Sequence, residues 1–300
     1  MHPGGAREWR ALLCSSGLPH RPEVDHAAMD LDQLLDFLWR EYSAITPDAP
    51  AIHRLLAARG EEIVNDHIAF RTYNLAPIGL ESLARPFLER GYVYVQTYHF
   101  ERKGLRAFSY AHPEPDRPRL FISELLTERF SPELQETVRG LVAEVPAELA
   151  GSVALYERRP SWRPIRFADY ERLLAESEYA GWLSAFGLLA NHFTVSFNHL
   201  RSFASFAAFN DWLAAGGFRM NRSGGTVVKG SPADLLEQSA ILASRIPWEF
   251  AGGERHTIPS CYYEFALRHV DPATGHLFDG FVTPSADRIF ESTDSRENAS

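Results

Sequence analysis

The chain has 300 residues, of which 45% are hydrophobic and 12% aromatic, so it can bury a sizeable core and is not disordered over most of its length. Its net charge of -9 leaves no basic surplus for gripping a phosphate backbone, which excludes nucleic acid as an expected partner. Two cysteines cannot form a disulfide framework, and no run approaches the ~20 apolar residues of a membrane helix. We therefore expect a cytoplasmic protein without a membrane partner.

The beginning of the chain predicts a flexible tail followed by helices. Residues 1–28 mix Gly, Pro, Ser and charged residues without periodicity, so we expect a single domain over residues 29–300. After Asp30, apolar residues recur at helical spacing. They predict two helices before the first strand, with Leu31, Leu34, Leu35, Phe37 and Leu38 in the first and Ile52, Leu55 and Leu56 in the second.

The first predicted strand is DHIAFRTY at residues 66–73. A helix is expected over residues 80–90 and ends at Gly91, since glycine commonly follows the last turn of a helix. The alternating, aromatic run VYVQTYHF at residues 93–100 predicts the next strand.

The same order of elements recurs in the second half of the chain. The strand-like run NHFTVSFN contains His192, which follows a small polar residue, and a helix is expected over residues 203–215 before a Gly-Gly pair. His67 precedes Gly91 by 24 positions, and His192 precedes Gly217 by 25. Strand, helix and glycine-aromatic step therefore occur twice with nearly equal spacing.

Each half also contains a later apolar strand with a single glutamate. These strands are RLFISEL with Glu124 and SCYYEFAL with Glu264. A chance match of spacing is the alternative, because any α+β protein places helices between strands. The pattern predicts an α+β fold of two repeated modules, at about residues 60–130 and 185–290.

Polar residues inside apolar strands are costly unless they have partners, which makes the strand histidines and glutamates candidate metal ligands. Two histidines and one carboxylate are the ligand set typical of iron(II) oxygenases, so His67, His192 and Glu264 are the predicted ligands. The structural alternative for Glu264 is a pair with Arg268. Glu124 is the competing ligand, and a four-ligand site containing it would suit a lyase or isomerase better than an oxygenase.

Arg71 is the candidate for binding substrate. It follows His67 by four residues, so in a strand both share a face about 13 Å apart, and a guanidinium could reach a group bound at the metal. A planar guanidinium forms two parallel hydrogen bonds to a carboxylate. The alternative is a structural salt bridge, with Asp66 or another nearby acid.

Four stretches of the chain resemble the 2-oxoadipate dioxygenase/decarboxylase (hydroxyglutarate synthase) family. They are DHIAFRTYN at residues 66–74, RAFSYAHPEPDRPRLFISELL at 106–126, NHFTVSFN at 191–198, and IPSCYYEFALR with LFDGFVTPSADRIFEST between 258 and 293. The resemblance implies a fold like that of the vicinal-oxygen-chelate enzymes. In that fold, paired βαβββ modules form a half-open barrel around a metal, here with additional helices.

The resemblance also implies roles for individual residues. The metal histidines of the family fall on His67 and His192, the metal carboxylate on Glu264, and the substrate-binding arginine on Arg71. Val282, within GFVTPSA, is similar in position to a residue that lines the substrate.

The activity implied by the resemblance is an iron(II)-dependent oxidation. A 2-oxo dicarboxylic acid such as 2-oxoadipate would react with O2 to give a 2-hydroxy acid, 2-hydroxyglutarate, and CO2. Two other classes stay open from sequence. A vicinal-oxygen-chelate isomerase or glyoxalase-like enzyme would use a divalent metal without oxygen, and a non-enzymatic binding protein would need no metal.

Overall fold

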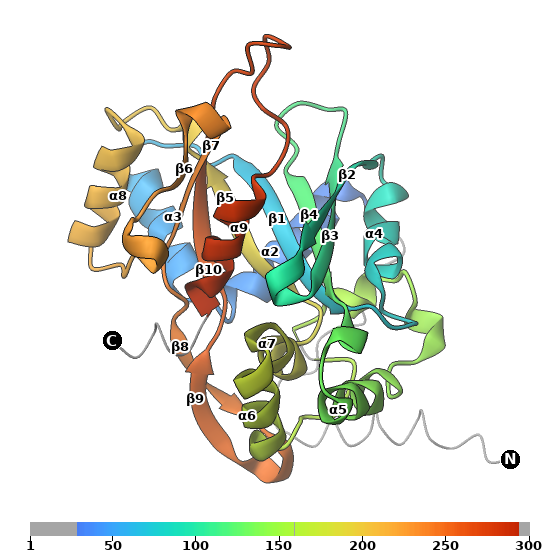
Figure 1. Cartoon of the computed structure of the whole chain (residues 1–300). Helices are drawn as coiled ribbons and strands as arrows, with labels where there is room; N and C mark the ends of the chain where they lie inside the picture. Colours follow the sequence, from blue (N-terminus) through green and yellow to red (C-terminus); the bar gives the residue numbers. More distant parts are fainter. Residues whose placement is uncertain (1–28, 159, 294–300) are drawn as a thin grey trace, which may run out of the picture.

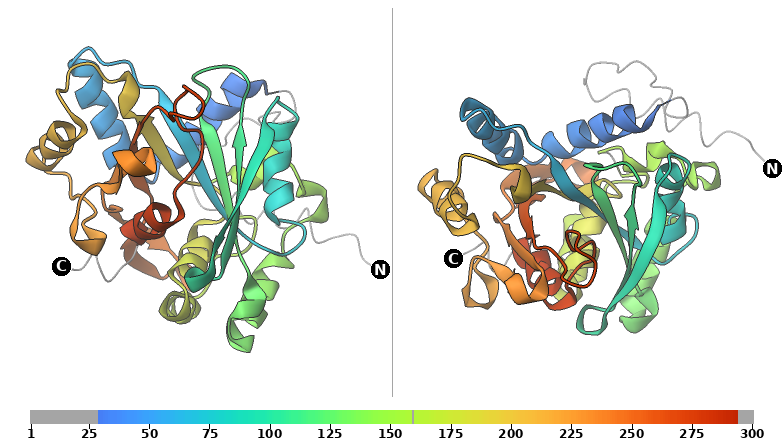
Figure 2. Two further views of the ribbon diagram at one scale, coloured as in Figure 1. Left: turned by 45° about the horizontal axis from the view of Figure 1, so that its top comes forward. Right: turned by 90° about the horizontal axis from the view of Figure 1, so that it is seen from above.

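The computed structural model describes residues 29–158 and 160–293, and the predicted tail at residues 1–28 lies outside the described residues. Its centre is an eight-stranded sheet in the order β2-β3-β4-β1-β5-β10-β7-β6, curled into a half-open barrel (Figures 1 and 2). These strands are β1 (Asn65–Tyr73), β2 (Val93–Phe100), β3 (Leu105–Ala111), β4 (Arg119–Leu125), β5 (Ala190–Ser196), β6 (Lys229–Ser231), β7 (Leu236–Ala240) and β10 (Tyr262–Arg268). A separate hairpin pairs β8 (Arg245–Glu249) with β9 (Arg255–Pro259).

Helices cover both faces of the sheet. They are α2 (Leu31–Ser43), α3 (Asp48–Ala58), α4 (Leu80–Leu88), α5 (Pro132–Val142), α6 (Phe167–Glu176), α7 (Glu178–Phe186), α8 (Phe206–Ala215) and α9 (Thr283–Ile289). The two helices predicted before the first strand are present as α2 and α3, whereas α5, α6 and α7 were not predicted. Within the described part of the chain, no helix has the length and apolar character needed to cross a membrane.

Helix α9 closes the open side of the barrel. It lies in front of the sheet in Figure 1, whereas α2 and α3 lie behind it. Helix α2 packs against β5, α3 against β10 and α4 against β4, all on the convex face. Helix α9 contacts β2, β6 and β7, and β2 and β6 are the two edge strands of the sheet. Helix α9 therefore spans the concave face from edge to edge, while α7 contacts β1, where Glu178 of α7 pairs with Arg71 on that face.

The pairing of β1 with β5 is symmetric about its centre. The strands run antiparallel, with His67 opposite Thr194 and His192 opposite Ala69. A two-fold rotation that exchanges the two histidines would therefore reproduce the same pairing of residues. Strand β4 pairs parallel with β1, as β10 does with β5. The predicted duplicated βαβββ fold is confirmed, with the β8–β9 hairpin inserted before the last strand of the second half, while the boundaries of the domain and modules stay a prediction.

Both predicted glycine turns follow their helices. Gly91 and Gly217 have φ angles of 94° and 89°, in the left-handed region that glycine adopts without a Cβ clash. In each turn the aromatic residue that follows donates its N–H to a backbone carbonyl five residues earlier, over 3.1 Å in the first copy and 3.2 Å in the second. The same helix ending is thus built twice.

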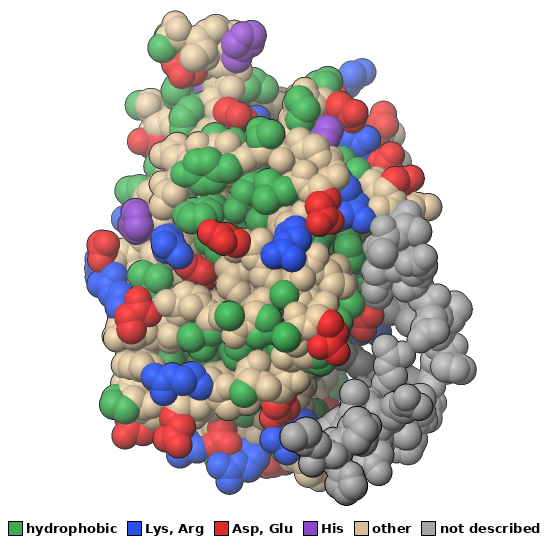
Figure 3. All heavy atoms as spheres, turned by 90° about the vertical axis from the view of Figure 1, so that its right-hand side faces the viewer, with side chains coloured by type: hydrophobic (Ala, Val, Ile, Leu, Met, Phe, Trp, Pro, Cys, Tyr) green, Lys and Arg blue, Asp and Glu red, His purple; other side chains and the backbone are tan. Residues whose placement is uncertain are grey.

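The edge strand β2 carries an apolar surface. Figure 3 shows hydrophobic side chains gathered on the face at the right of Figure 1, where α4 and β2 lie. Val93, Tyr94 and Val95 of β2 are 56%, 53% and 40% exposed. An edge strand also offers unpaired backbone groups, but the register of β2 shifts between Tyr94 and Gln96, which interrupts a regular edge.

The strand register shows that Glu124 is not the counterpart of Glu264. Glu264 lies opposite Thr194 on β5. The symmetric counterpart of Thr194 is Ala69, whose partner on β4 is Phe121. Glu124 lies three residues further along β4 and belongs to no metal-binding group among the described residues, so its interpretation as a competing ligand is wrong.

Glu124 instead joins its own strand β4 to the start of α4 and to β3. Its buried carboxylate accepts a hydrogen bond from the backbone N–H of Leu80, over 3.2 Å, at the start of α4. It also accepts one from Nε of Arg106 on β3, over 2.9 Å. An anion at this place compensates the first free N–H groups of the helix.

We predict that Glu124→Gln lowers the free energy of unfolding by about 1–2 kcal/mol, because the amide retains the shape but loses the charge. The loss is small because Arg106 is partly exposed to solvent, which screens its attraction to the carboxylate. Chemical denaturation of the variant and the wild type measures the difference. Metal content should not change, and loss of a bound metal in this variant would contradict the structural role.

Candidate metal centre

Three adjacent strands bring the predicted ligands together on the concave face. His67 comes from β1, His192 from β5 and Glu264 from β10, and one ligand atom of each lies within 4.8 Å of the others. Nε2 of His67 lies 3.4 Å from Nε2 of His192 and 3.5 Å from Oε1 of Glu264. Nε2 of His192 lies 3.2 Å from Oε2 of Glu264. All three side chains are buried, and no other such group occurs within residues 29–158 and 160–293.

The residue before each histidine orients its imidazole. Nδ1 of His67 lies 2.8 Å from Oδ1 of Asp66, and Nδ1 of His192 lies 3.1 Å from Oδ1 of Asn191. Because these oxygens accept, each Nδ1 is assigned the proton, and each Nε2 directs a lone pair towards the centre. Outer partners of this kind fix the tautomer of metal-bound histidines. The sequence contained the signal, since both strand histidines follow a small polar residue, but it did not assign these roles.

Burial controls protonation at the centre. It lowers the pKa of His67 and lowers that of His192 well below the ordinary value, so both imidazoles are neutral near pH 7. The short contacts to Glu264 are therefore not ion pairs. Burial raises the pKa of the Glu264 carboxyl to about 8, because removal from water penalises its charged form.

Glu264 lacks a compensating cation among the described residues. Its Oε1 accepts a hydrogen bond from Nε2 of Gln238 over 2.6 Å, while Oε2 accepts none. The structural alternative, a pair with Arg268, is not formed, because that guanidinium binds Asp66 over 2.7 and 2.9 Å. An uncompensated buried carboxylate between two lone pairs is costly, and a divalent cation would neutralise it. The donor set therefore fits a metal.

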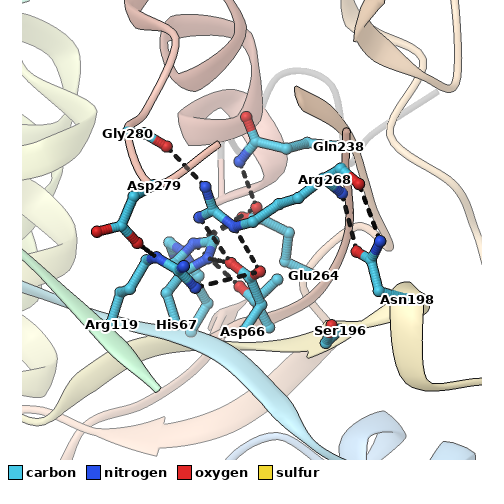
Figure 4. Close-up of polar contacts among 12 residues, drawn as sticks. Asp66, His67, Arg119, Ser196, Asn198, Gln238, Glu264, Arg268, Asp279 and Gly280 are labelled. Atoms are coloured by element: carbon cyan, nitrogen blue, oxygen red, sulfur yellow. Dashed lines mark hydrogen bonds and ion pairs between the residues drawn. The ribbon is translucent and has the colours of Figure 1, made fainter. Parts of the chain in front are cut away.

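An ion-pair network surrounds the centre (Figure 4). Burial raises the pKa of Asp66, but Arg268 and His67 outweigh this effect and hold the pKa below its ordinary range. Arg268 also donates to the carbonyl of Gly280 over 2.8 Å. Arg119 pairs with Asp279 in the same segment. The network thus connects the base of β1 to the chain that enters α9.

Arg71 is buried at 1% exposure, away from Asp66. Its Nη1 lies 3.0 Å from Oε1 of Glu178, and its Nη2 donates to Thr293 over 3.1 Å. The guanidinium carbon lies 4.9 Å from the ring centroid of Tyr179 and 5.1 Å from that of Trp182. The salt bridge considered from sequence is therefore formed, with a residue of α7. Nε of Arg71 is buried and finds no acceptor within residues 29–158 and 160–293.

Apolar side chains wall the space beside the ligands. A cavity of about 10 Å³, room for about one water molecule, adjoins the three ligand candidates and Gln238. Its other walls are Phe121, Phe281, Ala286, Ile289 and Phe290. Val282, the expected substrate-lining residue, is not part of this wall. It is partly exposed and immediately precedes α9, where its carbonyl accepts hydrogen bonds from the backbone of that helix.

Comparisons with known proteins identify relatives over most of the chain. The sequence model of the family described as 2-oxoadipate dioxygenase/decarboxylase matches residues 27–274. The chloroplastic/amyloplastic 2-oxoadipate dioxygenase/decarboxylase of Oryza sativa subsp. japonica is 34% identical over 275 residues, covering 84% of this chain and 75% of the relative. The chloroplastic enzyme of Arabidopsis thaliana is 34% identical over 260 residues, covering 78% of this chain and 69% of the relative.

Solved structures agree with this family and with the fold. The hydroxyglutarate synthase of Oryza sativa in complex with 2-oxoadipate has a TM-score of 0.84 at 31% identity, covering 94% of this chain and 100% of that one. A putative hydrolase of Shewanella frigidimarina has a TM-score of 0.79 at 44% identity, over 85% and 98%. A putative glyoxalase-superfamily protein of Ralstonia eutropha, at 24% identity and a TM-score of 0.66 over 83% and 84%, shows the vicinal-oxygen-chelate-like fold alone. The chain belongs to the 2-oxoadipate dioxygenase/decarboxylase family, whose members are oxidative decarboxylating enzymes.

Proposed function

We propose that this chain is an iron(II)-dependent dioxygenase that converts a 2-oxo dicarboxylic acid of the 2-oxoadipate class, with O2, into a 2-hydroxy acid and CO2. For 2-oxoadipate the product is 2-hydroxyglutarate, and the atoms of one acid and one O2 balance those of the two products. The observation that carries the proposal is Glu264, a buried carboxylate without a compensating cation beside two imidazole lone pairs. Family membership supports the reaction.

His67, His192 and Glu264 would hold the metal. Two neutral imidazoles and one carboxylate leave a divalent ion with one net positive charge and open positions, as in other non-haem iron(II) oxygenases. When bound, iron(II) would supply the redox chemistry that O2 needs to react with a 2-oxo acid. Asp66 and Asn191 hold the imidazoles in the required tautomer.

The remaining groups prepare the environment of the reaction. Gln238 holds one oxygen of Glu264, which orients the carboxylate. The apolar walls next to the ligands, Phe121, Phe281, Ile289 and Phe290, exclude water from the reacting groups. Arg71 would bind a carboxylate of the acid, supported by its burial and by its Nε–H, which has no acceptor.

Oxygen consumption distinguishes this reaction from that of a vicinal-oxygen-chelate isomerase, which uses a divalent metal without O2. The decisive assay is anaerobic reconstitution with iron(II), followed by an oxygen electrode over a series of 2-oxo acids. Equal amounts of O2 consumed and CO2 released support the proposal, and turnover without O2 overturns it. The cytoplasmic location stays a prediction, since the two plant relatives are named as plastid proteins.

We predict that His67→Ala, His192→Ala and Glu264→Ala each weaken metal binding by more than about 100-fold, because loss of an outer partner alone costs about 10–100-fold. Elemental analysis after dialysis should give one metal per wild-type chain and almost none in the variants. Glu124→Gln is the matched control. Full iron occupancy and activity in His192→Ala would remove that residue from the site.

The metal-free protein should lose stability with rising pH because of Glu264. Its folded pKa of about 8 exceeds the ordinary value of 4.5, so the folded state binds this proton more tightly and is destabilised as pH rises towards 8. The lowered pKa values of His67 and His192 act in the opposite direction, but only below the ordinary value of 6.5. From about pH 7 to about pH 8.5 the carboxyl effect should therefore dominate among these three groups.

Chemical denaturation in the presence of a chelator tests this expectation. Wild type should become less stable relative to Glu264→Gln over that pH range, because the amide does not titrate. Saturation with a divalent metal should remove the difference in slope, since the metal replaces the proton. Parallel curves for the two metal-free proteins would show that Glu264 does not retain its proton.

Arg71→Ala should weaken transition-state binding by about 2–5 kcal/mol and lower kcat/KM accordingly, because a substrate carboxylate would be left unpaired in a partly desolvated site. Metal content should hardly change. Arg71→Lys should restore only part of the loss, since an ammonium group does not form the two-pronged contact. The measurements are kcat/KM and the melting temperature on one preparation.

Glu178→Gln is the control for a purely structural Arg71. It removes the salt bridge seen at 3.0 Å but retains the guanidinium. If the pair only stabilises the fold, Arg71→Ala and Glu178→Gln should both lower the melting temperature and leave kcat/KM of the folded fraction normal. Normal kcat/KM of Arg71→Ala on every 2-oxo acid would remove Arg71 from the active site.

A further inference from the structure

Tyr262 lies beside the ligand candidates, and none of the roles proposed above uses its hydroxyl group. It precedes Glu264 by two residues on β10, so both side chains face the barrel interior. Its ring stacks on the imidazole of His192, with centroids 4.5 Å apart and planes 28° from parallel. The side chain is fully buried, and its hydroxyl group has no hydrogen-bond partner among the described residues. Such a group lowers stability and calls for a functional reason.

A second buried donor without an acceptor among the described residues is the Nε–H of Arg71. On the sheet, Tyr262 lies opposite His192 and His192 lies opposite Ala69, which precedes Arg71 by two residues on the same face of β1. Ile289 packs with Tyr262 in one apolar cluster, and the ring centroid of Phe290 lies 5.9 Å from the guanidinium carbon of Arg71. Both apolar residues also line the cavity at the metal ligands. Two adjacent residues of the cavity wall thus pack with the side chain of Tyr262 and lie beside the guanidinium group of Arg71.

The charges at the site explain why a neutral donor is needed. A 2-oxo dicarboxylate brings two negative charges, while a divalent metal with Glu264 carries one net positive charge. Arg71 is already paired with Glu178 at 3.0 Å, so this pair adds no net charge. The carboxylate away from the metal must then be stabilised largely by hydrogen bonds, and an O–H beside an N–H matches its two oxygens.

We propose that the hydroxyl group of Tyr262 and the Nε–H of Arg71 together bind the substrate carboxylate that lies away from the metal. Tyr262 is then a determinant of selectivity for dicarboxylic over monocarboxylic 2-oxo acids. The inference rests on the proposed function and adds a residue that binds the carboxylate at the far end of the substrate.

Tyr262→Phe removes the hydroxyl group and retains the ring that stacks on His192. Calorimetric titration of the zinc-loaded protein measures binding without oxidation, because zinc has no redox chemistry. The ligands are 2-oxoadipate and 2-oxohexanoate, which differ at the far carboxylate. The variant should bind 2-oxoadipate about 10–100-fold more weakly, as expected for a lost hydrogen bond to a charged group, and 2-oxohexanoate unchanged. Its melting temperature should stay constant or rise, because an unpaired buried hydroxyl group is removed.

Tyr263→Phe is the matched control on the opposite face of the same strand. The hydroxyl group of Tyr263 is satisfied at 2.6 Å from Nε2 of His53, so its removal should lower the melting temperature and leave the binding of both acids unchanged. Wild-type affinity of Tyr262→Phe for 2-oxoadipate, or an equal loss for both acids, would overturn the inference. Failure of zinc-loaded wild type to bind either acid would overturn the proposed function itself, and is a distinct result.

Discussion

The antiparallel pairing of β1 with β5 is the constraint on which the candidate centre depends. Because His67 lies opposite Thr194 and His192 opposite Ala69, the two histidines are related by a local two-fold axis, and their Nε2 atoms meet at 3.4 Å. Two lone pairs at that distance repel each other, and a bound divalent cation would remove the repulsion. Strand β10, parallel to β5, then places Glu264 at the third corner. The duplication therefore provides the two histidine nitrogens. Only the second half provides a carboxylate, because the residue of β4 that corresponds to Glu264 is Phe121.

Two buried carboxylates, Asp66 and Glu264, lie close together but have different hydrogen-bond partners. Asp66 receives the guanidinium of Arg268 through two hydrogen bonds, so it stays charged and holds the Nδ1 proton of His67. Glu264 accepts a hydrogen bond only from the neutral side-chain amide of Gln238. The guanidinium of Arg268 thus serves the outer acid, and the inner acid is left for a metal.

The sequence predicted which polar side chains meet at the candidate centre better than it predicted their surroundings. His67, His192 and Glu264 were recognisable because repeated polar residues inside apolar strands require partners. Glu124 was misread because positions along the chain do not report strand register. It lies three residues beyond Phe121, the residue of β4 that corresponds to Glu264 on β10. The partner of Arg71 on α7 is 107 residues away, and no periodic pattern connects such positions. Local patterns therefore specify which residues need partners, while long-range packing decides which partners they obtain.

The segment around α9 encloses the candidate centre. It touches both edge strands, and Ile289 and Phe290 fill the space at the ligands down to a cavity of about 10 Å³. That space holds about one water molecule and is too small for a 2-oxo acid. Arg268 holds the chain before the helix, and Thr293 after it donates to Glu178 and accepts from Arg71. Side chains that lie beside the candidate centre therefore hold the segment that closes the barrel at both of its ends.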